Sequence, residues 1–139
     1  VIPWATFTDP ELARVGLTEQ EARDKYGNDI QVVKQEYADV DRAQADGTTA
    51  GFAKIITKRN GEILGAHLVG AAAGELIHEI ILAMSHNLKL SALSGIHIYP
   101  TLAEVNSKAA FAQTRQNYEQ NHRLQQMLSS IFRFWRRFG

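Results

Sequence analysis

The dipeptide Asn60-Gly61 constrains the fold of this chain more than any other feature. Asn-Gly between two β-forming segments is a strong signal for a β-hairpin, because both residues tolerate the positive φ angles of a tight turn. The segment 51–58 before it alternates apolar and polar residues, and the segment 62–69 after it is rich in aliphatic residues. Residues 30–38 form a third β-rich segment with one polar face. The sequence therefore predicts an antiparallel meander.

Other segments predict helices around this meander. Thr18 and Glu21 have the spacing of a capping box, which predicts a helix that ends near Gly27. The remaining assignments are a first strand within 1–15, a surface loop over 39–47, and helices over 75–88 and 100–112. The predicted fold class is α+β, an antiparallel sheet of about four strands with helices packed on one side, plus a C-terminal helical extension.

Composition excludes several functional classes. Fifteen basic residues balance fifteen acidic ones, so no overall field favours nucleic acid. The chain has no cysteine, which excludes disulfides and redox thiols within it, and its histidines are not spaced as metal ligands, so we expect no metal site. No membrane-length apolar run or signal peptide is present, and a cytoplasmic protein is expected. The start at Val1 suggests a fragment of a longer enzyme.

The stretch from Ile96 to Glu104 holds the strongest candidate for chemistry. Pro100 suits a first helical turn and forces the residue before it out of the α region, so the chain should arrive extended. His97 and Tyr99 would then lie on one side of an entering strand. Glu104 would fall in the first turn of the following helix, where a carboxylate meets the positive end of the helix dipole.

These residues resemble the His-x-His-Pro-Thr-x-x-Glu signature of the flavin-dependent pyridine nucleotide–disulfide oxidoreductases. Residues 3–19 are similar to the opening of the same family's dimerisation domain. The resemblance covers 1–115 and implies a dimerisation domain there, with 116–139 as an amphipathic helical tail. It implies a two-fold homodimer, FAD and NAD(P)H in the parent enzyme, the FAD and NAD(P) domains of that enzyme as partners, and no cofactor bound by this fragment alone.

The resemblance also implies roles for individual residues. Tyr99 stands where the family commonly has a histidine that acts as acid–base partner for a thiol pair in the other subunit, and Glu104 matches the residue that orients it. A phenol is a poor general base at neutral pH, which argues against dihydrolipoamide or glutathione chemistry. A tyrosine at this position is similar to the mercuric-reductase-like branch of the family. That branch's C-terminal cysteine pair is absent. Tyr99, Pro100 and Thr101 would contact the flavin, with a cis peptide before Pro100.

Each of these roles has a plainer alternative. Tyr99 could be a buried ring with a satisfied hydroxyl, and His97 could be a strand residue hydrogen-bonded to backbone rather than a catalytic group. Glu104 could be a hydrogen-bond partner of His97 or Tyr99, or only a helix charge. The implied function is a dimerisation domain of a flavin-dependent NAD(P)H-disulfide oxidoreductase-like enzyme that supplies residues to the partner's active site and is inactive as an isolated fragment.

The last segment has a different composition. Residues 113–126 are rich in glutamine and asparagine, and an apolar stripe then follows at helical spacing: Leu124, Met127, Leu128, Ile131, Phe132, Trp135 and Phe138. Arginines lie off this stripe. Such a helix could pack on its own domain or on the dimer partner, lie on a membrane surface, or be disordered in isolation. A non-enzymatic association module with a membrane- or protein-binding tail is therefore the alternative function.

Overall fold

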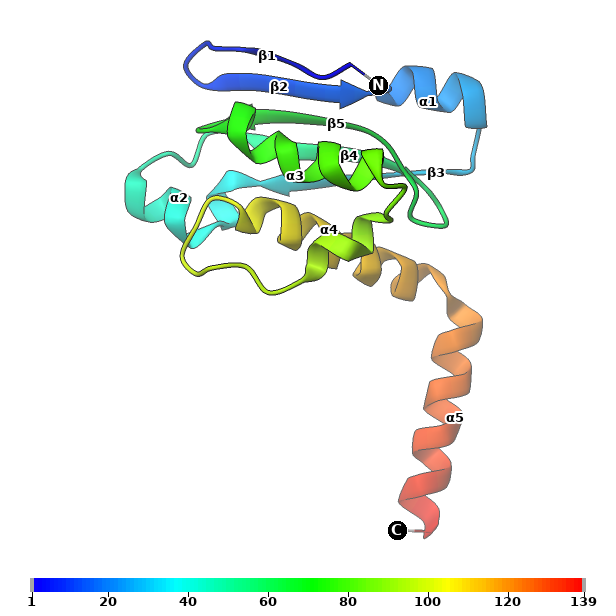
Figure 1. Cartoon of the computed structure of the whole chain (residues 1–139). Coiled ribbons are helices and arrows are strands. Elements are labelled where there is room, and N and C mark those ends of the chain that lie inside the picture. The colour runs from blue at the N-terminus through cyan, green and yellow to red at the C-terminus, as the bar shows by residue number, and fades with distance from the viewer. Residues whose placement is uncertain (1, 139) are drawn as a thin grey trace.

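The computed structural model describes residues 2–138, without the side chains of residues 123, 124 and 135–138. Five antiparallel strands form one sheet in the order β1-β2-β5-β4-β3 (Figure 1). The strands are β1 (Trp4–Thr6), β2 (Glu11–Gly16), β3 (Ile30–Glu36), β4 (Phe52–Lys58) and β5 (Ile63–Gly70). The helices are α1 (Glu19–Tyr26), α2 (Asp41–Asp46), α3 (Ala73–Ser85), α4 (Glu104–Gln120) and α5 (His122–Phe138), with short 3-10 turns at Tyr37–Asp39 and Leu90–Ser94. The α+β class is confirmed.

The β4–β5 hairpin lies at the centre of the sheet, as the Asn60-Gly61 signal predicts. Gly61 adopts a φ of 91°, and the Asn60 side chain accepts a hydrogen bond of 2.9 Å from the amide of Glu62. The sheet has one strand more than the expected four, because the first 15 residues fold back at Asp9-Pro10. The Thr8 hydroxyl donates to the Pro10 carbonyl at 2.8 Å in this turn.

Helices α3 and α4 cover one face of the sheet, as expected, and enclose the main core. Its strand residues occupy alternate positions, which is the pattern of a strand with one face buried. Its fully buried members include Ala13, Val33, Ala53, Ile55, Ala66 and Leu68 from the strands and Ala73, Ile80, Val105, Ala109 and Ala110 from α3 and α4. Beneath α4, the Gln113 amide donates to the Thr57 hydroxyl at 2.6 Å, which satisfies a polar pair inside this core.

The opposite face carries α1 and a smaller apolar cluster of Ala22, Ile30, Ile56 and Leu64. The predicted capping box is confirmed, since Thr18 accepts from the Glu21 amide and Glu21 accepts from the Thr18 amide. Gly65 permits the close approach of this connection, because a Cβ there would lie 2.0 Å from the Leu17 carbonyl oxygen. The backbone of residue 17 therefore packs directly on β5.

Three element assignments were wrong in detail. The stretch 39–47 is not a loop, because α2 forms there and buries Ala43. The final core helix begins at Glu104 rather than Pro100, since residues 101–106 first make shorter i→i+3 turns, such as Val105 to Leu102 at 3.1 Å. Helix α3 begins two residues earlier than expected and ends at Ser85. Asn87, in the left-handed region at φ 53°, follows that end.

Helix α5 confirms the expected helical extension and projects away from the sheet (Figure 1). Helix α4 continues past the domain boundary predicted at residue 115 and ends at Gln120. Asn121 separates it from α5. Of the alternatives given by the sequence, packing along the body of its own domain is not seen among the described residues, where α5 contacts the end of α4 and extends beyond it. Among the described residues, no helix has the length and apolar character needed to cross a membrane. Leu124, Trp135 and Phe138 of the predicted stripe lie outside the described side chains.

Candidate functional site

The site is built on the irregular segment 95–101, which links the 3-10 turn at Leu90–Ser94 to the start of α4. Its apolar side chains face outward: Ile98 and Tyr99 are 81% and 67% exposed. The expected cis peptide between Tyr99 and Pro100 is present. The expected entering strand is wrong, because Thr101 curls the segment by donating from Oγ1 to the Ile98 carbonyl at 2.7 Å. A segment without a neighbouring strand has no ladder of hydrogen bonds to hold it extended.

His97 anchors this segment to the body of the domain. Its Nε2 lies 2.9 Å from Oε1 of Glu79 on α3, and its Nδ1 lies 2.8 Å from the Gly95 carbonyl oxygen. The other carboxylate oxygen of Glu79 accepts from the buried Asn106 amide of α4 at 2.9 Å. The same amide donates to the Leu76 carbonyl. One polar network therefore joins the segment to both helices that cover the sheet.

The partners of His97 determine its protonation. A carbonyl and a carboxylate can only accept hydrogen bonds, so both ring nitrogens must carry a proton for both bonds to form. Partial burial acts to lower the pKa of His97, but the hydrogen bonds to Gly95 and Glu79 and the nearby charge of Glu104 outweigh it and raise that pKa. His97 is thus bonded to a side chain as well as to backbone, in a segment that is not a strand.

Tyr99 extends away from His97, so the two side chains do not share a partner. Its hydroxyl donates to the Asp41 carboxylate of α2 at 2.8 Å. This hydrogen bond and the charge of Asp41 raise the pKa of the phenol above its usual value, which keeps the hydroxyl protonated at neutral pH. The ring is exposed rather than buried. Tyr99 is therefore exposed at the surface, with its single hydroxyl proton donated to Asp41.

Glu104 and Thr101 contact each other rather than the proton carriers. The Glu104 carboxylate accepts from the Thr101 amide at 3.4 Å, a long first-turn contact. Of the two readings given by the sequence, the first-turn helix charge matches this geometry. Glu104 still acts on His97 and Tyr99 through its charge, since it raises the pKa of both.

Sequence reasoning missed Glu79, Asn106 and Asp41, which hold His97 and Tyr99. Asp41 lies 58 residues away from Tyr99, and no local pattern connects them. Glu79 carried a weak signal, because it is an acidic residue in the middle of a largely apolar helix. Such a residue often has a specific partner when it faces the protein. No cluster of three or more metal-ligating side chains occurs within the part of the chain that the structure describes.

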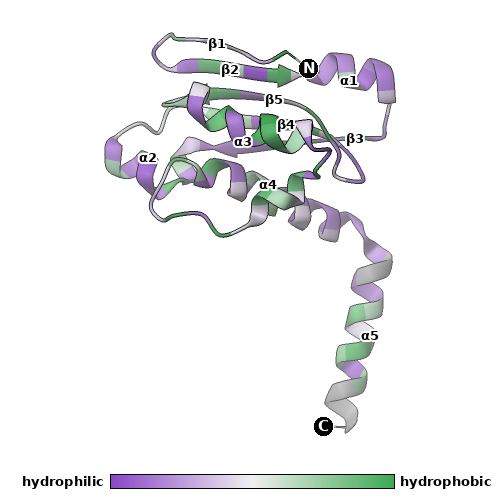
Figure 2. Cartoon of the chain, viewed as in Figure 1, coloured by the Kyte–Doolittle hydropathy of each residue, from purple (hydrophilic) through white to green (hydrophobic). Residues whose placement is uncertain are grey.

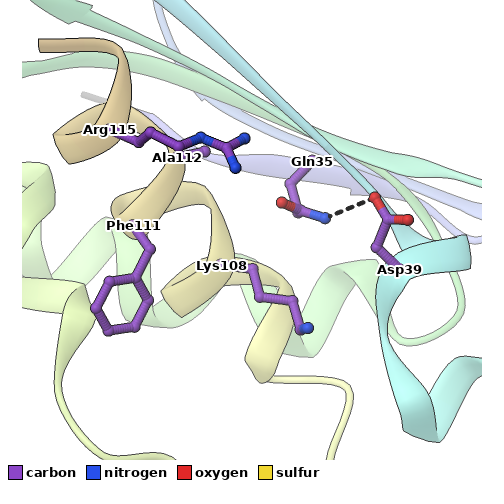
Figure 3. Close-up of a pocket in the computed structure, with 6 residues that line it drawn as sticks. All are labelled: Gln35, Asp39, Lys108, Phe111, Ala112 and Arg115. Carbon is purple, nitrogen blue, oxygen red and sulfur yellow. Dashed lines mark hydrogen bonds between the residues drawn. The ribbon is translucent and has the colours of Figure 1, made fainter. Parts of the chain in front are cut away.

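A separate groove lies between α4 and the end of β3 (Figure 3). Its volume is about 310 Å³, and it is lined by Gln35, Asp39, Lys108, Phe111, Ala112 and Arg115. Gln35 donates to Asp39 at 3.2 Å on one wall, while Lys108 and Arg115 extend from the helix on the other. This groove does not include any residue of the 95–101 segment.

The chain belongs to the family described as the dimerisation domain of pyridine nucleotide-disulphide oxidoreductases, whose model matches residues 2–110. The resemblance seen in the sequence is therefore confirmed. The match ends before α5 begins, so that helix lies outside the family's shared fold.

Similar proteins include a dehydrogenase and a reductase. The chain is 41% identical to the dihydrolipoyl dehydrogenase of Corynebacterium glutamicum over 79% of its own length and 24% of that protein. It is 44% identical to the mycothione reductase of Mycobacterium tuberculosis over 78% of its length and 24% of that protein. It thus spans about a quarter of the curated relatives that it matches.

Solved structures agree with this assignment. The HOCl-induced flavoprotein disulfide reductase RclA from Escherichia coli superposes with a TM-score of 0.74 at 33% identity, over 78% of this chain and 25% of that one. LpdA from Mycobacterium tuberculosis gives a TM-score of 0.71 at 28% identity, over 78% and 24% of the respective chains. Both solved structures therefore share the fold of this domain, and RclA is named a flavoprotein disulfide reductase.

Proposed function

We propose that this chain is the dimerisation domain of an FAD-dependent NAD(P)H oxidoreductase, and that it delivers segment 95–101 to the active site of a two-fold-related partner. This proposal rests on one observation: segment 95–101 exposes its apolar side chains, and its backbone is held in place by the rest of the domain. Ile98 and Tyr99 face outward, while His97 ties the backbone beside them to α3 and α4. An outward-facing apolar segment held from behind is suited to insertion into a second surface.

The residues of this segment fit a contact to one edge of a flavin ring rather than a binding site for the whole nucleotide. Tyr99 offers a hydroxyl and an apolar ring, while Pro100 is exposed and Thr101 is half-buried beside it. FAD supplies the electron transfer between reduced nicotinamide and a thiol pair in enzymes of this kind. We expect Tyr99, Pro100 and Thr101 to touch the flavin bound by the partner, and the remaining domains to hold it.

Tyr99 would act as a hydrogen-bond donor and not as a base. Its phenol stays protonated at neutral pH, since an unperturbed tyrosine has a pKa of about 10 and Asp41 raises it further. If the hydroxyl exchanges its bond to Asp41 for one to the partner's site, it would stabilise negative charge that develops on a thiolate or an acceptor. Glu104 would contribute through its charge, which favours the protonated form of Tyr99.

Tyr99→Phe in the intact enzyme tests this role. We expect turnover to fall about 100-fold with flavin content unchanged, because the variant keeps the ring and removes only the donor. Tyr118→Phe on α4 is the matched control, since Tyr118 is also exposed and lies outside the segment. Unchanged turnover in Tyr99→Phe with intact flavin would exclude a role for the hydroxyl.

A second candidate function is an association module without catalysis. The specific observation in its favour is α5, which lies outside the family match and exposes most of its described apolar side chains. In this case the intact protein would bind a protein or a membrane surface through α5. It would also lack flavin and would not oxidise NADH or NADPH, which are measurements that separate it from the first proposal.

A further inference from the structure

Helix α5 is amphipathic and has no covering partner within the described residues. Its helical spacing places Met127, Ile131 and Phe132 on one side and Arg133 on the opposite side. Figure 2 shows these alternating bands along a helix that stands clear of the domain. The side chains of Met127, Phe132 and Phe134 are more than half exposed. An exposed apolar face of this kind is a binding surface.

The charge of this segment is strongly one-sided. Residues 122–139 contain four arginines and no acidic residue, whereas all fifteen acidic residues of the chain lie before residue 122. Arg133 bonds only to Ser129 on its own helix, at 3.3 Å to the carbonyl, and has no acidic partner among the described residues. Arg133 is thus a cationic group of α5 that no acidic side chain neutralises among the described residues.

We propose that α5 binds an anionic membrane surface, lying in the plane of the interface with its apolar face among the acyl chains. An anionic bilayer is the occupant that satisfies both faces at once, with phosphate groups for the arginines and an apolar layer for the aromatic side. A second copy of α5 would instead bring four arginines against four. The helix lies on the surface rather than across it, in agreement with its arginines and its length of about 25 Å.

A two-fold dimer would present two such helices. Binding of the first helix raises the effective concentration of the second at the same surface, so the dimer should bind more tightly than a single helix. This strengthening rests on the dimer in the proposed function. The affinity of a single α5 helix for the membrane does not depend on the dimer, so the membrane proposal and the proposed function can be disproved separately.

Vesicle co-sedimentation of the intact protein tests the proposal. We expect binding to vesicles of equal parts phosphatidylcholine and phosphatidylglycerol, at least about tenfold weaker binding to phosphatidylcholine alone, and weakening as salt is raised. A variant that lacks residues 122–139 should not bind either kind. Each charge near an anionic surface changes affinity about fivefold, so Arg133→Glu, which alters two charges, should weaken binding about 30-fold.

Two further variants complete the test. Lys25→Glu on α1 makes the same charge change at an exposed site that is far from α5 in the sequence, and it should leave vesicle binding unchanged. The double variant Ile131→Ser/Phe132→Ser should bind less than the parent on anionic vesicles, because it removes apolar area and no charge. Equal binding to both vesicle kinds, no binding, or binding that survives loss of residues 122–139 would overturn the proposal. So would capture of an acidic protein through α5 without any vesicle binding.

Discussion

His97 shows how a single residue can fasten a functional segment to a domain. Its ring is bonded on both sides, to Gly95 and to Glu79, and Glu79 is in turn bonded to the buried Asn106. The charged groups that face it are Glu79 from α3 and Glu104 from α4. Loss of its proton removes one donor and leaves an acceptor facing an acceptor. The stability that His97 contributes must therefore depend on pH.

The sign of this dependence follows from the direction of the pKa shift. Because the folded-state pKa of His97 is raised, its stabilising contribution is complete below the unfolded value of about 6.5 and is lost as pH rises through the folded value. We expect the difference in unfolding free energy between the parent and His97→Gln to be larger at about pH 6 than at about pH 9. Urea denaturation at the two pH values measures it.

The pKa of His67 is shifted in the opposite direction to that of His97, but this shift does not affect the comparison of the two proteins. Burial lowers its pKa, so its contribution falls as pH drops, but it is present in both proteins and cancels in the difference. In a Glu79→Gln background the pH dependence of the His97→Gln effect should shrink, because one of the two acceptors has lost its charge. A difference that stays constant or grows with pH would contradict a stabilising imidazolium.

At the scale of elements, the helices α1 to α4 differ in how they begin. The start of α1 was predicted from a capping motif, and of these four helices α1 is the one with a side-chain cap. Helix α1 begins at the capping box of Thr18. The N-cap residues of α2, α3 and α4 are Val40, Ala72 and Ala103, and none of them makes a side-chain cap hydrogen bond. Without a capping residue the sequence holds little information about where a helix begins. This explains the missed α2 and the displaced starts of α3 and α4.

Thr18→Ala should reveal what the cap contributes. The substitution removes the acceptor of the Glu21 amide, which lies 3.2 Å from Thr18 Oγ1, and should lower the unfolding free energy by about 1 kcal/mol. Thr18→Ser keeps the hydroxyl and should retain most of the stability. Chemical denaturation of the three proteins gives the comparison, and equal stability of Thr18→Ala and the parent would show that the box contributes nothing.

At the scale of the whole molecule, exposed apolar side chains accumulate around the outer side of α3. Leu82 lies on the helix and is 59% exposed, while Phe7 lies on the neighbouring β1–β2 turn. A hollow of about 200 Å³ between β1 and α3 is lined by Trp4, Phe7, His78 and Ile81. Segment 95–101 is tied to the same helix through Glu79. This surface is where the two-fold contact of the proposed dimer should form.

Leu82→Glu tests that location. A carboxylate buried in an apolar interface without a partner is strongly unfavourable, so the molecular mass in solution should fall by half. Met127→Glu on α5 is the matched control, because Met127 is similarly exposed at 55% and lies outside the proposed contact. Light scattering coupled to size exclusion measures both. A Leu82→Glu protein that remains a dimer would place the contact on another surface.

The division between sequence and structure follows the range of the interactions involved. Asn60-Gly61, the alternation in the flanking strands and the Thr18 capping box are local patterns that act within a few residues, so the sequence alone determined the antiparallel β3–β4–β5 meander and α1. The His97–Glu79–Asn106 network and the Tyr99–Asp41 bond join residues up to 58 positions apart. Only the tertiary structure could decide them, because such contacts exist only after α3, α4 and α2 have been packed around the same segment.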